Sequence, residues 1–243
     1  MKNEKGTGAV VLLLILPIFM GTIYAIGTQS LEIQKITRGR HLCRSHLLET
    51  QKKVGLLLAK IIQMNPVVSS LRTEKAMAEA ALKIAIETGD YPAMGAAQVW
   101  LKSIEARQVM IARQQRLLFT LVKGQFNLGL RLTQSAIRSE LEQIQARSQK
   151  SWAQNISPIK IQIPQPPLSP DIPDNSDTEP RIYTPKEPFI EKAAVHASWI
   201  TSLETTDRIK EWFSIKTKNS DGCSVSLEEK AGGFQPVLIK GKF

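Results

Sequence analysis

The chain has few of the residues on which metal sites and disulfide scaffolds depend. Its 243 residues include two Cys, three His and only 6% aromatic side chains. Two Cys cannot build a disulfide-dense scaffold or a four-cysteine zinc site. The chain also lacks a nucleophile elbow, an HExxH motif and a phosphate-binding loop with its Lys-Ser/Thr. We therefore predict no enzyme activity, no catalytic or metal-binding residue, no cofactor and no small-molecule substrate.

Charge is missing from the start of the chain, where no charged residue lies between Lys5 and Glu32. Residues 8–27 read GAVVLLLILPIFMGTIYAIG. About 20 apolar residues in a helix, at a rise of 1.5 Å per residue, span a hydrocarbon core of roughly 30 Å. The run is apolar on all sides, unlike most helices that pack on a protein core. We therefore predict that residues 1–27 form a membrane anchor or a signal segment.

Two fates of this segment remain open. In a cleaved signal peptide, Lys2 and Lys5 form the charged start, and Ala25-Ile26-Gly27 is a small-x-small cleavage site. The product would be a secreted or periplasmic helical adaptor. In a retained anchor the helix runs on, and the following residues contain no helix breaker apart from Gly39. We favour the anchor, because a turn or an extended stretch usually follows a signal peptide.

The sidedness signals conflict. Four basic residues follow the apolar run, namely Lys35, Arg38, Arg40 and Arg44. By the positive-inside rule they favour a body in the cytoplasm. That rule weakens when a long C-terminal domain follows a very short N-terminus, which behaves as a signal anchor with the C-terminus outside. We expect the body to lie outside the cytoplasm.

Residues 28–150 are predicted to be helical. Leu47, Val54 and Ile61 recur every seven residues, which predicts an amphipathic helix that continues from the membrane segment to about Met64. Asn65-Pro66 then predicts the start of a second helix, with Asn65 as N-cap and Pro66 in the first helical position.

Gly89 has the position of a C′ residue that ends the second helix. A third helix then follows, from Asp90 or Tyr91 to about Ser148. Gln108 and Gln115 occupy seam positions of its apolar stripe, so any coiled coil is imperfect. The predicted fold is mainly α: a transmembrane helix that continues into a long helical hairpin or coiled-coil body.

The rest of the chain is predicted to be a linker and a small β module. Nine of the 13 Pro lie between Pro158 and Pro188, so residues 151–188 are predicted to be a semi-rigid, extended Pro-rich linker. Residues 189–243 would form a small β-hairpin module. Alternation and turn residues predict strands at 213–217, 223–227 and 234–239, turns at 218–222 and at Gly232-Gly233, and a strand or helix at 195–203.

His41, Cys43 and His46 lie within six residues, but they make a poor metal site. On a helix His41 is about 140° away from His46, and a fourth ligand is missing. We interpret them as a polar helix face. Cys43 and Cys223 could form a disulfide in an oxidising compartment, and two free buried Cys are the alternative.

The formal net charge of +10 is concentrated in one region. Residues 28–150 hold 19 Lys and Arg against nine Asp and Glu. Basic residues on the third helix are Arg107, Arg113, Arg116, Lys123, Arg131 and Arg138. Aromatic residues are not interleaved with them and no nucleic-acid-binding motif occurs. We therefore expect a solvated basic face, or one that meets acidic partners or lipid headgroups, rather than a nucleic-acid-binding surface.

Residues 1–27 also carry a resemblance. A short charged head and small residues, Lys5-Gly6-Thr7-Gly8-Ala9, precede the apolar run VVLLLILPIF with Pro17 inside it. This pattern resembles the TadE/TadG-like, pilin-like proteins of tight-adherence (Flp-type) pilus systems. The resemblance implies a non-enzymatic, single-pass protein of the bacterial inner membrane with a periplasmic body. It would act as a pilus-assembly or pseudopilin-like component, with other envelope or pilus-assembly proteins as partners.

Overall fold

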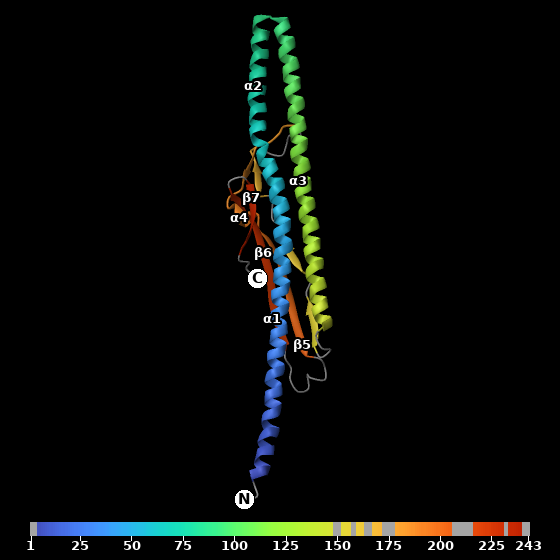
Figure 1. Cartoon of the computed structure of the whole chain (residues 1–243). Coiled ribbons are helices and arrows are strands. Elements are labelled where there is room, and N and C mark those ends of the chain that lie inside the picture. The colour runs from blue at the N-terminus through green and yellow to red at the C-terminus, as the bar shows by residue number, and fades with distance from the viewer. Residues whose placement is uncertain are drawn as a thin grey trace.

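The computed structural model describes residues 4–147, 152–156, 159–162, 167–171, 178–205, 216–230 and 233–239. Three long helices form most of the structure, and an antiparallel sheet lies along the C-terminal half of the first helix (Figure 1). The predicted fold, mainly helical with a small C-terminal sheet, is confirmed.

Helix α1 (Glu4–Gln63) is one helix of 60 residues, about 90 Å long at 1.5 Å per residue. It includes Pro17 and continues through Gly39, so the continuous helix predicted from the sequence is confirmed. Gly39 serves close packing here, because a Cβ at this position would lie 3.3 Å from the Trp199 ring.

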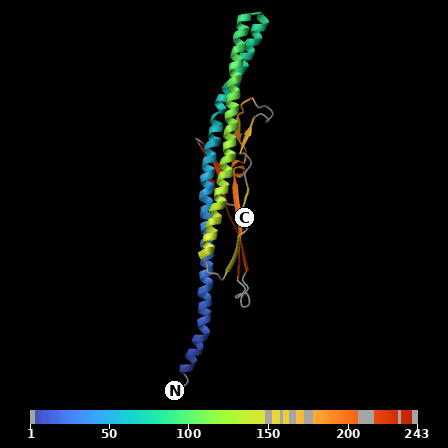
Figure 2. The same cartoon turned by 90° about the vertical axis from the view of Figure 1, so that its right-hand side faces the viewer.

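Helices α2 (Asn65–Thr88) and α3 (Tyr91–Arg147) form a hairpin. Gly89 ends α2 in the left-handed conformation, with φ of 68°, and its N–H donates to carbonyls of the last turn, as predicted. The Asp90 carboxylate accepts a hydrogen bond from the Ala93 N–H at 3.1 Å and so caps α3. Figure 2 shows the hairpin extending beyond the sheet at one end of the molecule, with the N-terminal part of α1 at the other.

α3 packs against α2 with its first part and against α1 with its second part. The α1 residues spaced by seven, Leu47, Val54 and Ile61, are fully buried. The two helices approach closely at Gly129 of α3, where an added Cβ would lie 2.2 Å from Thr50 Oγ1 and 2.8 Å from Thr50 Cβ. A Cβ atom does not come this close to a non-bonded heavy atom, so a side chain at position 129 would force the two helices apart.

The main sheet has the strand order β1-β5-β6-β7, and β2 also pairs with β5. All of its pairs are antiparallel. The strands are β1 (Trp152–Ile156), β2 (Lys160–Gln162), β5 (Val195–Thr205), β6 (Lys216–Lys230) and β7 (Gly233–Leu238), and a short helix, α4 (Phe189–Lys192), precedes β5. α1 packs on β6 and β7 at Gly55, where a Cβ would lie 3.0 Å from the Phe234 carbonyl oxygen and 3.3 Å from a Leu227 methyl group.

The turn predicted at residues 218–222 is wrong. β6 runs through this segment without a break, and β5 pairs with it from Lys216 to Val225. A long ladder on a neighbouring strand therefore outweighs the local turn preference of Asn, Asp and Gly. The predicted strands at 223–227 and 234–239 lie in β6 and β7, where Leu238 ends β7. The segment 195–203, predicted as a strand or a helix, lies in β5. Residues 213–215 and 231–232 lie outside the described residues.

The Pro-rich range 151–188 differs from the extended spacer expected from the sequence. It contains β1, β2, β3 (Leu168–Pro170) and β4 (Tyr183–Pro185), and the last two pair with each other. Leu168 and Tyr183 are almost fully buried. Pro is compatible with short strands at a sheet edge, because its missing N–H can face away from the ladder. Burial of the few apolar residues then draws the segment onto the helices.

We call residues 167–171 and 178–188 the strap, because they lie across the junction of the three long helices. The Asn65 amide donates to the Tyr183 carbonyl at 2.8 Å and accepts from the Tyr183 N–H at 3.0 Å. Gln115 makes the same double contact with the backbone of Arg181, at 2.7 and 3.0 Å. The prediction of Asn65 as N-cap is wrong, because its amide holds the strap and Met64 takes the cap position without a side-chain bond.

A third contact of the strap is sensitive to acid. Burial of Asp171 would raise its pKa, but hydrogen bonds from Arg72 and from the Ile182 N–H outweigh this effect and hold the pKa below its ordinary value. A carboxyl with a lowered pKa stabilises the fold above its unfolded-state pKa of about 3.9. That stability is lost as the pH falls through the folded-state pKa.

We therefore expect Asp171→Asn to lower the free energy of unfolding by about 1 kcal/mol at pH 7. The difference from the wild type should begin to shrink as the pH falls below about 4 and should be lost below the folded-state pKa. Urea unfolding at a series of pH values checks this. Glu142→Gln, which removes an exposed pair with Arg138 on α3, is the control and should change little. An equal effect of Asp171→Asn at pH 7 and pH 3 would contradict the assignment.

Candidate functional site

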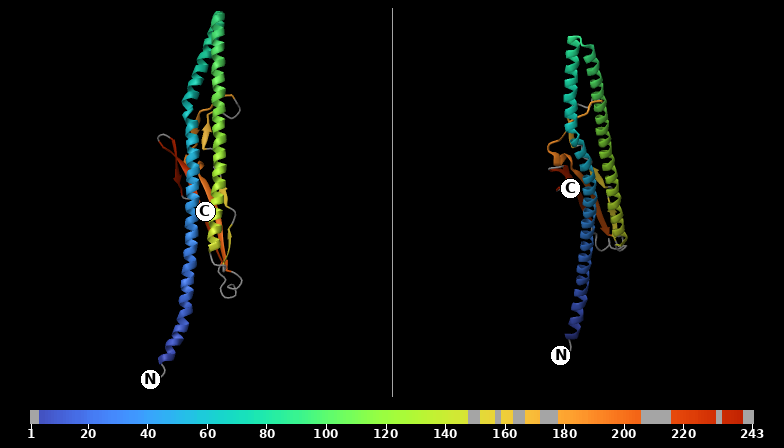
Figure 3. Two further views of the ribbon diagram at one scale, coloured as in Figure 1. Left: turned by 45° about the vertical axis from the view of Figure 1, so that its right-hand side comes forward. Right: turned by 45° about the horizontal axis from the view of Figure 1, so that its top comes forward.

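The N-terminal part of α1 projects from the body and presents apolar side chains on all sides. Figure 3 shows it extending past the sheet and past the end of α3. Nine large side chains in this part are between 43% and 67% exposed: Leu12, Ile15, Leu16, Ile18, Phe19, Met20, Ile23, Tyr24 and Ile26. A Cβ added at Gly21 or Gly27 would meet no atom within 4 Å. We call residues 8–27 the projecting segment.

One helical stretch of the described chain, Thr37–Thr88, is long and apolar enough to cross a membrane by length and composition alone. A third of the most apolar part of this stretch is buried inside the protein. The stretch also contains the core residues Leu47, Val54 and Ile61. A shorter apolar stretch, Ile15–Tyr24, lies within the projecting segment. Packing separates the two stretches, because the first is covered by the sheet and by α3 whereas the second is exposed.

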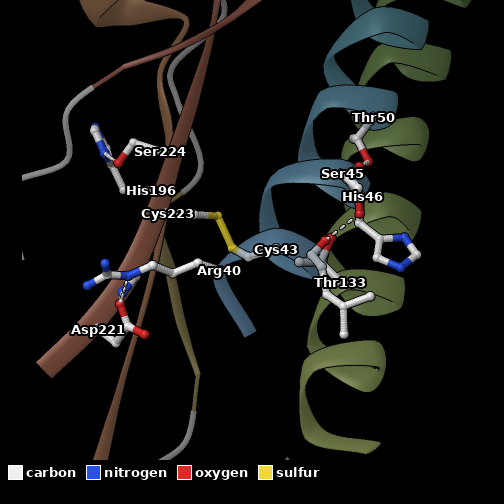
Figure 4. The surroundings of a disulfide bond; sticks show 12 residues. Arg40, Cys43, Ser45, His46, Thr50, Thr133, His196, Asp221, Cys223 and Ser224 are labelled. Carbon is white, nitrogen blue, oxygen red and sulfur yellow. Dashed lines mark hydrogen bonds and ion pairs between the residues drawn. A yellow bond between two sulfur atoms is a disulfide. The ribbon is translucent and has the colours of Figure 1, made fainter. Parts of the chain in front are cut away.

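A disulfide lies on the part of α1 that carries the sheet. Cys43 on α1 and Cys223 on β6 are joined, with Cα atoms 6.1 Å apart, across 180 residues of sequence (Figure 4). Both residues are buried. The bond therefore links α1 covalently to a central strand of the sheet, at a point about 24 Å along α1 from Gly27, where the projecting segment ends.

An ion pair between a buried carboxylate and a half-exposed Arg lies next to the disulfide. Arg40 Nε donates to Asp221 Oδ1 at 2.5 Å, and the Gly222 N–H donates to the same oxygen at 2.8 Å (Figure 4). Asp221 is 1% exposed, whereas the Arg40 side chain is 47% exposed. The other carboxylate oxygen, Oδ2, has no hydrogen-bond partner among the described residues. This pair and the disulfide lie one helical turn apart on the same face of α1 and together fasten the sheet to it.

The structure separates the other residues that the sequence singled out. His41 is exposed and the His46 ring points away from the disulfide (Figure 4), while Cys43 is bonded to Cys223. Within the ranges that the structure describes, no three His, Cys, Asp or Glu residues are placed to hold a metal ion. The six basic residues that the sequence singled out on α3 are exposed. Arg107 among them pairs with Glu74, and Arg138 pairs with Glu142.

The sequence did not predict the ion pair between Arg40 and Asp221 that lies beside the disulfide. Arg40 and Asp221 are 181 residues apart, and Asp221 lies in a segment with turn residues. A buried Asp opposite Trp199 in a strand pair has no local signature. The seven-residue spacing of α1 did indicate which face would be buried, but not which strand would cover it. Comparison with protein-family models, with curated proteins and with solved structures gives no match to this chain.

Proposed function

We propose that this chain is a non-enzymatic, single-pass envelope protein, anchored by the projecting segment, that associates with other proteins through its helical body. The observation that carries the proposal is the exposure of the projecting segment. A helix apolar on every side is costly to solvate, and about 20 such residues match a hydrocarbon core of roughly 30 Å. The packed half of α1 cannot insert without loss of the core that it shares with the sheet and α3.

The disulfide favours an oxidising compartment, outside the cytosol, for the body of the protein. Disulfides persist in secreted and periplasmic proteins and are rare in the cytosol, where thiols are kept reduced. We therefore infer that the protein is anchored in the bacterial inner membrane and that its body lies in the periplasm. The four basic residues after the projecting segment favour the opposite side, so the topology needs a direct measurement.

Within this class we propose a pilin-like component of pilus assembly. Two observations support this choice. Residues 1–27 resemble the N-terminal segment of TadE/TadG-like proteins, and α1 continues from the apolar segment into a half that packs on an antiparallel sheet, as in pilin-like subunits. The secreted or periplasmic adaptor remains the second candidate, and the small-x-small sequence before Thr28 favours it.

Carbonate extraction of membranes tests the anchor. We expect the wild-type chain to stay in the membrane pellet and Leu16→Lys/Phe19→Lys to move largely to the soluble fraction. Each Lys near the centre of a membrane helix costs roughly 3 kcal/mol on the insertion scale. Leu56→Lys/Ile84→Lys is the matched control, because it places two Lys at exposed apolar positions of the helical body. Release of the control variant instead would mean that the stretch Thr37–Thr88, and not the projecting segment, is the membrane anchor.

Two further measurements separate the candidates. Mass spectrometry of the mature N-terminus decides between anchor and signal peptide, since a chain that begins at Thr28 has lost the projecting segment. Maleimide labelling that starts from intact cells decides sidedness. Because both residues are buried, the cells are first precipitated with acid and the chain is labelled while denatured. We expect Cys43 and Cys223 to react only after reduction, whereas two thiols reactive without reduction would place the body in the cytoplasm.

A further inference from the structure

α3 has a second row of apolar side chains on the side away from its buried row. We call this row the outer stripe; its members are Met110, Leu117, Leu121, Leu128 and Leu132, between 44% and 61% exposed. Single exposed apolar residues are normal on a protein surface, but a continuous row is typical of an interaction site. The inner row of the same helix, with Ile104 and Ile137 fully buried, is already covered by α2 and α1.

The spacing of the outer stripe suits a straight partner helix. Met110, Leu121 and Leu132 recur at intervals of three helical turns, and Leu117 and Leu128 have the same spacing. Such a repeat has about 3.67 residues per turn, close to the period of the helix itself, so the row follows the axis of α3 without winding around it. From Met110 to Leu132 the row is about 33 Å long at 1.5 Å per residue.

The surface beside the outer stripe is hollowed. Two hollows lie between α3 and the junction of α1 with α2, and Val67 and Ile111 line both of them. Met110 borders one hollow and Leu117 the other. Apolar side chains of a second helix could enter these hollows as knobs while its backbone lies over the row.

On α3 itself the charge along the outer stripe has one sign. The carboxylate of Glu74 on α2, which lines one of the hollows, is already paired with Arg107. Residues 106–139 of α3 contain six Lys and Arg and no Asp or Glu. Arg113 and Arg131 are exposed, and they flank the row on one side because a whole number of helical turns, about five, separates them. Neither has an ion-pair partner in the part of the chain that the structure describes. The surface is thus an apolar row beside a basic rim.

This charge argues against a second copy as the occupant. Two outer stripes packed face to face would bring the basic rims together without a carboxylate on either helix between residues 106 and 139. Like charges across an interface are unfavourable. A lipid surface also fits poorly, because α3 runs along α1 (Figure 1) and the outer stripe is therefore roughly perpendicular to a bilayer that α1 crosses.

We propose that the outer stripe is the docking surface for an amphipathic α-helix of another protein, with an apolar face as long as the row and acidic residues along its flank. Apolar residues of that helix would cover Leu121 and Leu128, and its carboxylates would meet Arg113 and Arg131. This inference rests on the proposed function and gives the helix-mediated association a face and a partner chemistry.

A synthetic helical peptide provides the probe. As a helix it matches the row in length, about 33 Å, with Leu at the spacing of the outer stripe and Glu on the flank; a second peptide replaces every Glu by Lys. Binding of the labelled peptides to the full-length protein in neutral-lipid nanodiscs is followed by fluorescence anisotropy, with empty nanodiscs as blank. We expect the acidic peptide to bind at least about tenfold more tightly than the basic one.

Variants locate the binding. Leu121→Lys/Leu128→Lys should weaken binding of the acidic peptide at least about tenfold, whereas Ile84→Lys, an exposed apolar position on α2, should leave it unchanged. Arg113→Glu/Arg131→Glu should reverse the preference between the two peptides. All of these positions are exposed, so the circular dichroism spectrum should stay that of the wild type.

Other outcomes would overturn the inference. They are equal binding of both peptides, no binding, dimerisation that Leu121→Lys/Leu128→Lys abolishes, or attachment to phosphatidylglycerol vesicles through the outer stripe. The anchor is read separately by carbonate extraction. A chain that stays in the membrane without binding the peptide therefore contradicts only the docking surface, and a soluble chain that binds it contradicts only the anchor.

Discussion

Gly129→Ala is expected to destabilise the protein by about 3 kcal/mol, the upper end of the cost of overpacking a core. The added methyl group would lie 2.2 Å from Oγ1 and 2.4 Å from Cγ2 of Thr50. Thr is branched at Cβ and has little rotamer freedom in a helix, and its own Cβ is only 2.8 Å from the new atom. Relief therefore requires α1 and α3 to separate. Urea unfolding of the full chain in detergent measures the effect.

Gly124→Ala is the matched control, on the same helix and five residues away. A Cβ at Gly124 would meet no atom within 4 Å, so the better helix propensity of Ala should stabilise the protein by about 0.5–1 kcal/mol. The two substitutions are thus expected to have opposite signs. Adding Thr50→Gly to Gly129→Ala should recover part of the loss, because it removes all three clashing atoms. Stabilisation by Gly129→Ala would contradict the close crossing of α1 and α3.

Loss of the disulfide is expected to have the largest effect on stability. In the chain-entropy description, a bond that closes a loop of 180 residues contributes about 5 kcal/mol. Cys43→Ala/Cys223→Ala should therefore shift the urea midpoint far below that of the wild type. Dithiothreitol should shift the wild type in the same direction and leave the double variant unchanged. A wild-type midpoint that does not respond to reduction would show that the bond does not stabilise the body.

The helices could be predicted because their signals are local. Seven-residue spacing places Leu47, Val54 and Ile61 on one face, and a Gly at position 89 suits the left-handed end of α2 whatever lies around it. The path of the strap could not be predicted in the same way. The amides of Asn65 and Gln115 hold backbone groups that are 118 and 66 residues away, and Pro content indicates only where helix is excluded.

The candidate site also has features that local sequence predicts and features that depend on distant residues. The apolar run at residues 8–27 can be read directly from the sequence, and with two Cys only one intramolecular disulfide is possible. The pairing of Arg40 with Asp221 could not be foreseen, because Asn, Asp and Gly at residues 219–222 favour a turn until a neighbouring strand pairs with them. The outer stripe was missed for another reason. Its three-turn spacing is hidden among the buried apolar residues of the same helix.

The near-continuous path of α1 and α2 sets the distance between the projecting segment and the tip of the helical hairpin at Gly89. Met64 is the single turn residue between α1 and α2, and its carbonyl still accepts a hydrogen bond from the Val68 N–H at 3.0 Å. Residues 28–88 thus form a rod of about 90 Å at 1.5 Å per residue. With the projecting segment in a bilayer, the rod would carry the hairpin tip at Gly89 far beyond the lipid headgroups. The protein would then act as a spacer of defined length, and a change in the tilt of its anchor would be amplified at that tip.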